Sequence, residues 1–349
     1  MLARVAENVY WLARYLERAE NTARLVAANA QLLLDLPAGL APGWLPLVDI
    51  TGSRSVFDAG HTRVDEREVV GFLIAQADNP GSIASSLRMA RENARTLRDV
   101  LPTEAWEVLN ELFQEFTEKL PTGLSRRARF EFLKRVVLAS QTLSGVLEGT
   151  MNRNDAFTFL LLGRNIERAD MTSRIVDVRS AQRLPADAPE LAPFESIQWM
   201  SLLRSLSGYE MYRLSRRTRV GRTDVLEFVL REVQFPRACL TCLRQIEHHA
   251  AALPHSAPVL VAAAEARGFL GAAPLGELDE PALHALVDEL QLHLMAIHDR
   301  IAQAYFPAAA GARLRSEAAA PAARAAAAAP GLAGPSLAPA VLGARGAQH

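Results

Sequence analysis

The chain has 349 residues, half of them apolar, so it is long enough to bury a large core or to form two domains. Its 38 Lys and Arg residues balance 39 Asp and Glu residues, which argues against nucleic acid or an anionic membrane as the partner. It has two cysteines, no leader-like start and no apolar run of about 20 residues, so we expect a cytoplasmic protein that does not cross a membrane.

Apolar residues recur at intervals of three and four along most of the chain, which predicts an all-α fold, a multi-helix bundle. The first helix carries one apolar stripe from Val5 to Leu33 and should end before Pro37. Residues 37–65 are rich in Gly and Pro, and we interpret them as a long connection with one short helix at 44–50. Further helices are expected at 66–77, 82–101, 103–120, 125–149, 154–184, 194–217, 224–233, 236–252, 258–267 and 280–305.

A Pro-rich segment after the helix at 154–184 is the best candidate for a domain boundary. It divides the chain into a first helical part, residues 1–185, and a second part, residues 186–308. Residues 309–349 are dominated by Ala, Pro and Gly and offer little to bury, so we expect a disordered tail.

A charged segment near the start of the chain, "RYLERAENTARLV" at 14–26, returns 150 residues later as "RNIERADMTSRIV" at 164–176. Seven of the thirteen positions are identical, which predicts that the fold contains two related halves. The charged matches are Arg14 with Arg164, Glu17 with Glu167, Arg18 with Arg168, Arg24 with Arg174 and, as a conservative change, Glu20 with Asp170.

The polar residues around the first copy fall on one line of a helix, nearly opposite the apolar stripe: Tyr10, Arg14, Glu17, Asn21 and Arg24. One interpretation is a solvated face whose ion pairs contribute about 0.2–0.5 kcal/mol each. The other is a paired site, because both copies use Arg and keep an acid at the same turn, and Arg suits planar binding of carboxylate or phosphate. A shared cleft lined by both copies would support the second interpretation.

A third Arg-rich stretch, "LRMARENARTLRDVL" at 87–101, is similar to the first motif but out of register with it. Its Arg91, Glu92, Asn93 and Arg95 lie within about one turn of a helix. We therefore consider that three Arg-rich helices converge on one anionic ligand or one partner surface.

Four motifs resemble the bacterial alpha-E family, a helical domain of unknown function named for glutamates on helices: "MLARVAENVYWLARYLERAENTARLV", "NPGSIASSLRMARENARTLRDVL", "GRNIERADMTSR" and "FPRACL". The resemblance extends over residues 1–305 and implies a helical fold. Members are typically encoded beside, or fused to, a circularly permuted ATP-grasp protein, often with a transglutaminase-like peptidase. The resemblance thus implies a role in peptide ligation or modification, with ATP and Mg²⁺ on the partner ligase and no cofactor bound by this chain.

Carried over by position, the family's glutamates correspond to Glu17, Glu20, Glu92 and Glu167, with Asp170 at the place of Glu20. In "FPRACL" the family often has Ser where this chain has Ala238, whereas Arg237 matches. The catalytic candidates are therefore Glu17, Glu20, Glu167 and Asp170. The candidate substrate- or partner-binding residues are Arg14, Asn21, Arg24, Arg91, Glu92, Asn93, Arg95, Arg164, Arg168, Arg174 and Arg237.

Other site types have less support. Cys239 and Cys242 have redox spacing, but no βαβ pattern surrounds them, and we interpret them as core residues. The two acidic motifs lack the His of di-iron bundles, and interleaved Arg would repel a dication, so no metal site is predicted. The basic run at 213–222 indicates a solvated helix end or an acidic protein partner more than a nucleic-acid site.

Three functions stay open. The leading hypothesis is a helical accessory partner of an ATP-grasp ligase, in which Arg grips an anionic group and Glu orients an amine or accepts its proton. The second is an enzyme in its own right, with the carboxylates and arginines in a pocket between the two repeats. The third is a structural bundle with solvated ion-pair faces.

Overall fold

A computed structural model describes residues 1–37, 39–181, 191–216 and 218–306, which contain fourteen helices and no strand. This confirms the predicted all-α fold. The tail at 309–349 and most of the Pro-rich segment, residues 182–190, lie outside the described residues. None of the described helices has a stretch long and apolar enough to span a bilayer.

The first seven helices are α1 (Ala3–Asp35), α2 (Leu45–Ile50), α3 (Arg54–Gly60), α4 (Glu66–Ile74), α5 (Ile83–Arg95), α6 (Thr103–Gly123) and α7 (Arg126–Thr150). The other seven are α8 (Asp155–Ser180), α9 (Ala192–Ser205), α10 (Tyr209–Ser215), α11 (Arg222–Arg231), α12 (Cys239–Ala250), α13 (Ala257–Ala272) and α14 (Glu280–Tyr305). Most expected helices are found with ends shifted by a few residues, as is usual for helix termini.

Two elements differ from the sequence-based expectation. The helix expected at 194–217 is broken into α9 and α10, because Ser207 has a left-handed φ of 51° between them. The connection at 37–65 contains an unexpected second short helix, α3. Its buried Phe57 stacks on His61 and packs against Phe72, so tertiary contacts stabilise a segment with little local helical pattern.

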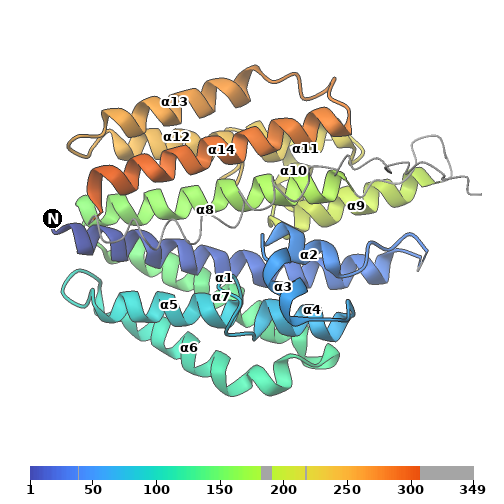
Figure 1. Cartoon of the computed structure of the whole chain (residues 1–349), viewed down its shortest axis with the longest axis horizontal. Helices are drawn as coiled ribbons and strands as arrows, with labels where there is room; N and C mark the ends of the chain where they lie inside the picture. The colour runs from blue at the N-terminus through green and yellow to red at the C-terminus, as the bar shows by residue number, and fades with distance from the viewer. Residues whose placement is uncertain (38, 182–190, 217, 307–349) are drawn as a thin grey trace, which may run out of the picture. The chain divides into compact units, whose positions relative to one another are not determined.

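Helices α1 and α8 run side by side and form the centre of the described bundle (Figure 1). Helices α5 and α7 pack against α1, and α6 packs against both of them. Helices α12 and α14 pack against α8, and α13 packs against both of those. Because neighbours cover them on several sides, α1 and α8 bury polar residues as well as apolar ones.

The order of the helices repeats along the chain. Helices α11 and α12 begin 156 residues after α4 and α5, and α13 and α14 begin 154 residues after α6 and α7. The packing repeats as well, since α5 lies on α1 as α12 lies on α8. The bundle therefore consists of two related halves, α1–α7 and α8–α14, which confirms the duplication indicated by the charged motif. The two halves meet between α7 and α8, whereas the domain boundary expected near residue 185 would follow α8. That boundary stays a prediction.

The two central helices approach each other closely at Gly163 of α8. A Cβ atom at this position would lie 2.3 Å from the carbonyl oxygen of Tyr10 in α1, so only glycine fits here. Beyond this crossing, every residue of α1 from Ala19 to Val26 is buried. The polar line of the first motif is thus enclosed by the fold and is not a solvated surface.

Candidate functional site

The two copies of the charged motif face each other and pair reciprocally. Arg18 of α1 donates from Nε to Oε1 of Glu167 in α8 at 2.7 Å. In the opposite sense, Nε of Arg168 in α8 lies 3.0 Å from Oε2 of Glu17 in α1. Both glutamates are almost fully buried, with exposed fractions of 3% for Glu17 and 2% for Glu167. The Glu-Arg dipeptide of each half is therefore neutralised by the same dipeptide of the other half.

A further arginine, Arg237, joins the Glu17 side from the loop that precedes α12. Its Nη1 donates to Oε1 of Glu17 at 2.5 Å and to Oδ1 of Asn21 at 2.7 Å, and its Nη2 donates to Oε1 of Glu20 at 3.3 Å. The hydroxyl of Thr172 donates to the backbone carbonyl of Arg237 at 2.9 Å. Helix α8 thus holds the loop in the position from which its arginine reaches the acids of α1.

The Glu167 side of the network has a different composition. Glu167 also accepts from Nε of Arg14 at 2.7 Å, so two arginines of α1 share its carboxylate. Asp170 accepts from Nε of Arg174 at 2.9 Å within α8, and the Arg174 guanidinium lies beside Gly52, in the turn between α2 and α3. On this side Glu167 is paired with two arginines and Asp170 with one.

The environment moves the pKa values of the buried acids apart. Burial alone would raise the pKa of Glu17, but Arg168 and Arg237 outweigh burial and lower the pKa to about 2. Burial is likewise outweighed at Glu167, where Arg18 and Arg14 lower the pKa to about 2. At Glu20, burial and the neighbouring Glu17 carboxylate raise the pKa. Glu20 is therefore the acid of this network that most readily takes up a proton.

A cleft of about 430 Å³ opens on the Glu17 side of the network. Residues of α1, α7, α8 and α10 line it together with the loops before α10 and α12. Its charged lining consists of Glu20, Arg24, Glu148, Arg164, Arg168 and Arg237. Both repeats contribute to one cleft, as the paired-site interpretation requires.

The arginines in the cleft have more donors than the protein supplies with acceptors. Arg24 is only 6% exposed and pairs with Glu20 through Nη2, but its buried Nε and Nη1 have no partner. Arg164 pairs with Glu148 through Nη1 at 2.6 Å, while its Nε is buried without a partner. Burial and the nearby Arg237 lower the pKa of Arg24 to about 10, and burial and Arg168 lower that of Arg164. This arrangement favours the approach of an anion.

The third Arg-rich stretch lies elsewhere. Nε of Arg91 donates to Asn110 of α6 at 2.9 Å, and its guanidinium lies over the ring of Phe113. Arg95 and Glu92 form an exposed pair at 3.0 Å, and the backbone carbonyl of Asn93 accepts from the hydroxyl of Thr96, the residue that follows α5. Of these four residues, Arg91 contacts α6 through its side chain, and none of the four lines the cleft.

Several participants were not identified from the sequence. Glu148 of α7 pairs with Arg164, and no periodicity in α7 distinguishes it from other surface acids. Arg179 donates to Asn29 at 2.9 Å, and these residues are related by the same shift of 150 as the motif, so the repeat could have revealed them. Tyr10 was predicted to lie on the polar line of the first helix, but its partner was not: it forms a buried hydrogen bond of 2.6 Å with His298 of α14.

The two cysteines are buried core residues, as expected. Sγ of Cys239 contacts the carbonyl of Ala169, and Sγ of Cys242 contacts the carbonyl of Pro236. Burial raises the pKa of both thiols, that of Cys242 to about 12. Neither group has the low pKa of a reactive cysteine.

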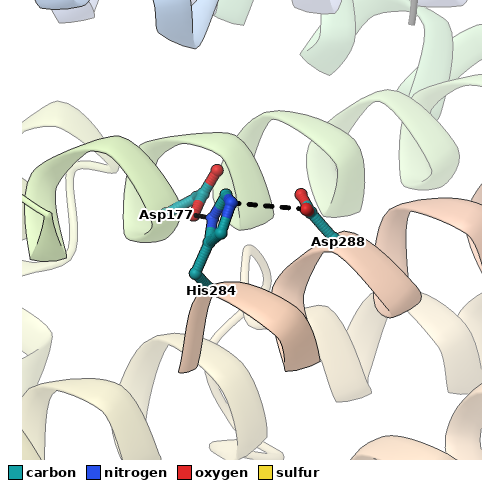
Figure 2. A group of neighbouring side chains, drawn as sticks. All are labelled: Asp177, His284 and Asp288. Carbon is teal, nitrogen blue, oxygen red and sulfur yellow. Dashed lines mark hydrogen bonds and ion pairs between the residues drawn. The ribbon is translucent and has the colours of Figure 1, made fainter. Parts of the chain in front are cut away.

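One cluster of potential metal ligands occurs in the described residues, away from the cleft (Figure 2). His284 of α14 lies between Asp177 of α8 and Asp288, with Nδ1 at 2.5 Å from Asp177 and Nε2 at 3.4 Å from Asp288. Each ring nitrogen faces a different carboxylate, and the hydrogen bond with Asp177 raises the pKa of His284. The geometry is that of an ion triad that ties α14 to α8.

Comparisons with known proteins give one family. A model named Alpha-E, described as a predicted alpha-helical domain with a conserved ER motif, matches residues 1–306. Among curated proteins, uncharacterized protein Mb2597 of Mycobacterium bovis and uncharacterized protein Rv2567 of Mycobacterium tuberculosis are each 27% identical over 278 residues. The match covers 72% of this chain and 30% of each relative, so the chain spans less than a third of their length. No solved structure matches.

Proposed function

The chain belongs to the Alpha-E family, and from this premise we propose that it is a helical accessory partner of an ATP-grasp type ligase. In this proposal the pair forms or modifies a peptide or amide bond, and the cleft receives an anionic group of the substrate or of the partner. The proposal includes a transglutaminase-like peptidase as a further partner. ATP and Mg²⁺ are assigned to the ligase.

The observation that carries this proposal is the excess of arginine donors in the cleft. Buried polar groups without partners are costly, so the free Nε and Nη1 of Arg24 favour an anionic group that enters from outside. Arg is well suited to hold such a group because its donors are planar and permanently charged. The cleft would thus position one reactant.

Glu20 supplies the second chemical element of the proposal. It lines the cleft beside Arg24, and its raised pKa makes it a better proton acceptor than Glu17. A base in this position can orient an amine and take up its proton as the amine attacks an activated acyl group. Glu17 and Arg237 act on Glu20 through charge and hydrogen bonding.

The length of the relatives is consistent with a module that works beside other parts. In the mycobacterial proteins, the region similar to this chain is 30% of a longer polypeptide. The helical module there has neighbours in the same chain. In the present proposal the corresponding neighbour is a separate ligase.

A second candidate function is an enzyme in its own right, with the carboxylate–arginine cleft as its active site. The separation of the pKa values of Glu17 and Glu20 favours it, because two acids with different proton affinities are what acid–base catalysis uses. The third hypothesis, solvated ion-pair faces, is not supported, since Glu17, Glu20 and Glu167 are all buried.

The experiment is co-expression with a circularly permuted ATP-grasp protein from the same organism, followed by co-purification and measurement of ATP turnover. We expect a stable complex, and we expect Glu20→Gln to lower turnover while the complex persists. Glu92→Gln, which changes an exposed pair on α5, is the matched control and should leave turnover unchanged. Absence of a complex would refute the partnership, and turnover by this chain alone would favour the second candidate.

A further inference from the structure

The charges around the cleft define the ligand's charge. Four arginines, Arg24, Arg164, Arg168 and Arg237, meet three carboxylates, Glu17, Glu20 and Glu148. With all three carboxylates ionised, these seven side chains leave an excess of one positive charge. A single carboxylate would neutralise it, whereas a phosphate monoester would bring a charge of about −1.5 to −2.

The uncharged lining of the cleft indicates which group is attached to the ligand's anionic end. Leu206, Met211, Phe235 and Pro236 form an apolar part of the lining next to the arginines. Small-molecule sites combine such apolar walls with a few polar groups that fix orientation, and they have volumes of about 300–1,000 Å³. The volume of about 430 Å³ lies in this range and exceeds what a bare ion requires. The ligand should carry an apolar group beside its anionic end.

The duplication shows that this arrangement is specific to one side of the fold. Arg174 is the counterpart of Arg24 in the second copy and pairs with Asp170, but it does not line the cleft. Arg237 precedes α12 by two residues, and the corresponding residue before α5 is Gly81. The related half therefore lacks the arginine that bridges Glu17 and Glu20, and it provides an internal control.

We propose that the cleft binds a single carboxylate on an apolar stem, as in an N-acylated amino acid or the free C-terminus of a peptide. The free Nε and Nη1 of Arg24 and the free Nε of Arg164 donate to the carboxylate. The apolar side chain of the ligand packs against Met211 and Phe235. This inference names the ligand class of the site in the proposed function and rests on that function for its biological setting.

The test is calorimetric titration of the full chain, without any ligase, with matched acids and amides. N-acetyl-L-leucine is compared with N-acetyl-L-leucinamide, and a short peptide ending in Leu is compared with its C-terminal amide. We expect each acid to bind at least about tenfold more tightly than its amide, because the amide loses the charge-assisted hydrogen bonds. The acid that binds more tightly identifies the source of the carboxylate. Inorganic phosphate should bind more weakly than either acid.

Two variants locate the site. Arg24→Gln should weaken binding of the better acid by at least about tenfold, while Arg174→Gln should leave it within about twofold. Both change an arginine paired with an acid four residues earlier, so they are matched in kind. Any of four outcomes would overturn the inference: equal binding of acid and amide, tighter binding of phosphate than of the acids, no binding at about 10 mM acid, or equal effects of the two variants. These measurements do not involve the ligase. A failure to bind the acids can therefore occur while complex formation and ATP turnover are observed, and binding of the acids can be observed without a complex.

Discussion

Arg18 and Glu167 lie 149 positions apart in the chain, yet their side chains meet at 2.7 Å between the two central helices. The equivalent contact, between Arg168 and Glu17, is made in the opposite direction. A buried charge that loses its partner is destabilising by several kcal/mol, so the two contacts hold the halves in one register. The following experiments test this and other features of the fold.

Removing the charge of Glu167 should destabilise the protein by about 3 kcal/mol, because Arg14 and Arg18 would lose their common acceptor. Urea unfolding measures the effect. The double variant with Arg18→Gln should be less destabilised than the sum of the single variants by about 1 kcal/mol or more. The exposed Glu92→Gln should change stability by less than about 0.5 kcal/mol. If it destabilised the protein as much as Glu167→Gln, the buried pairing would contribute no more to stability than an exposed pair.

The stability conferred by Glu167 should depend on pH. Its folded pKa of about 2 lies below the ordinary value of 4.5, so the contribution is complete above pH 4.5 and is lost as pH falls towards 2. The difference in unfolding free energy between the natural protein and Glu167→Gln should therefore shrink by about 3 kcal/mol over this range. Urea titrations at several pH values from neutral to 2 measure it. A difference that stays constant with pH would contradict the ionised, paired state of Glu167.

Gly163→Ala should disrupt the crossing of α1 and α8. The added Cβ would overlap the carbonyl of Tyr10, and because backbone must move, we expect a loss of about 3 kcal/mol or more. Gly268→Ala in α13 is the control, since no atom lies within 4 Å of its Cβ position. That change should be neutral or stabilising by up to about 1 kcal/mol. Thermal unfolding of both variants would decide, and similar melting temperatures would argue against the close approach.

Cys239 and Cys242 should be unreactive in the folded protein. Both thiols are buried, and burial raises their pKa, so little thiolate is present at neutral pH. Ellman's reagent should label neither cysteine in buffer and both in guanidinium. Fast labelling of the folded chain would instead indicate a redox role for this pair.

Local patterns predicted most helices because amphipathic periodicity and Gly or Pro breaks determine where helices begin and end. The last helix, 280–305, was predicted with the bounds that the structure has. The break at Ser207 was missed because a left-handed serine carries no distinctive sequence feature. Helix α3 was missed because it depends on the contacts of Phe57 with residues outside the helix.

The candidate site was predicted in part. Repetition of the motif identified Glu17, Arg24 and their counterparts, but periodicity on one helix could not show that a line opposite the apolar stripe is covered by another helix. Arg237 was suggested by the family resemblance alone, and its bonds to three residues of α1 depend on the position of the loop before α12. Glu148 has no local feature that marks it as a partner of Arg164.

The reciprocal pairing means that this protein is organised like a homodimer whose two subunits have been joined. A chain that ended after α7 would retain Glu17 and Arg18 but lose Arg168 and Glu167, which neutralise them. A second copy of that shortened chain would offer the missing charges at equivalent positions, so self-association is its natural outcome. By the same reasoning, a change of charge at one of these positions in one half requires a compensating change in the other half. Substitutions at the paired positions should therefore be correlated.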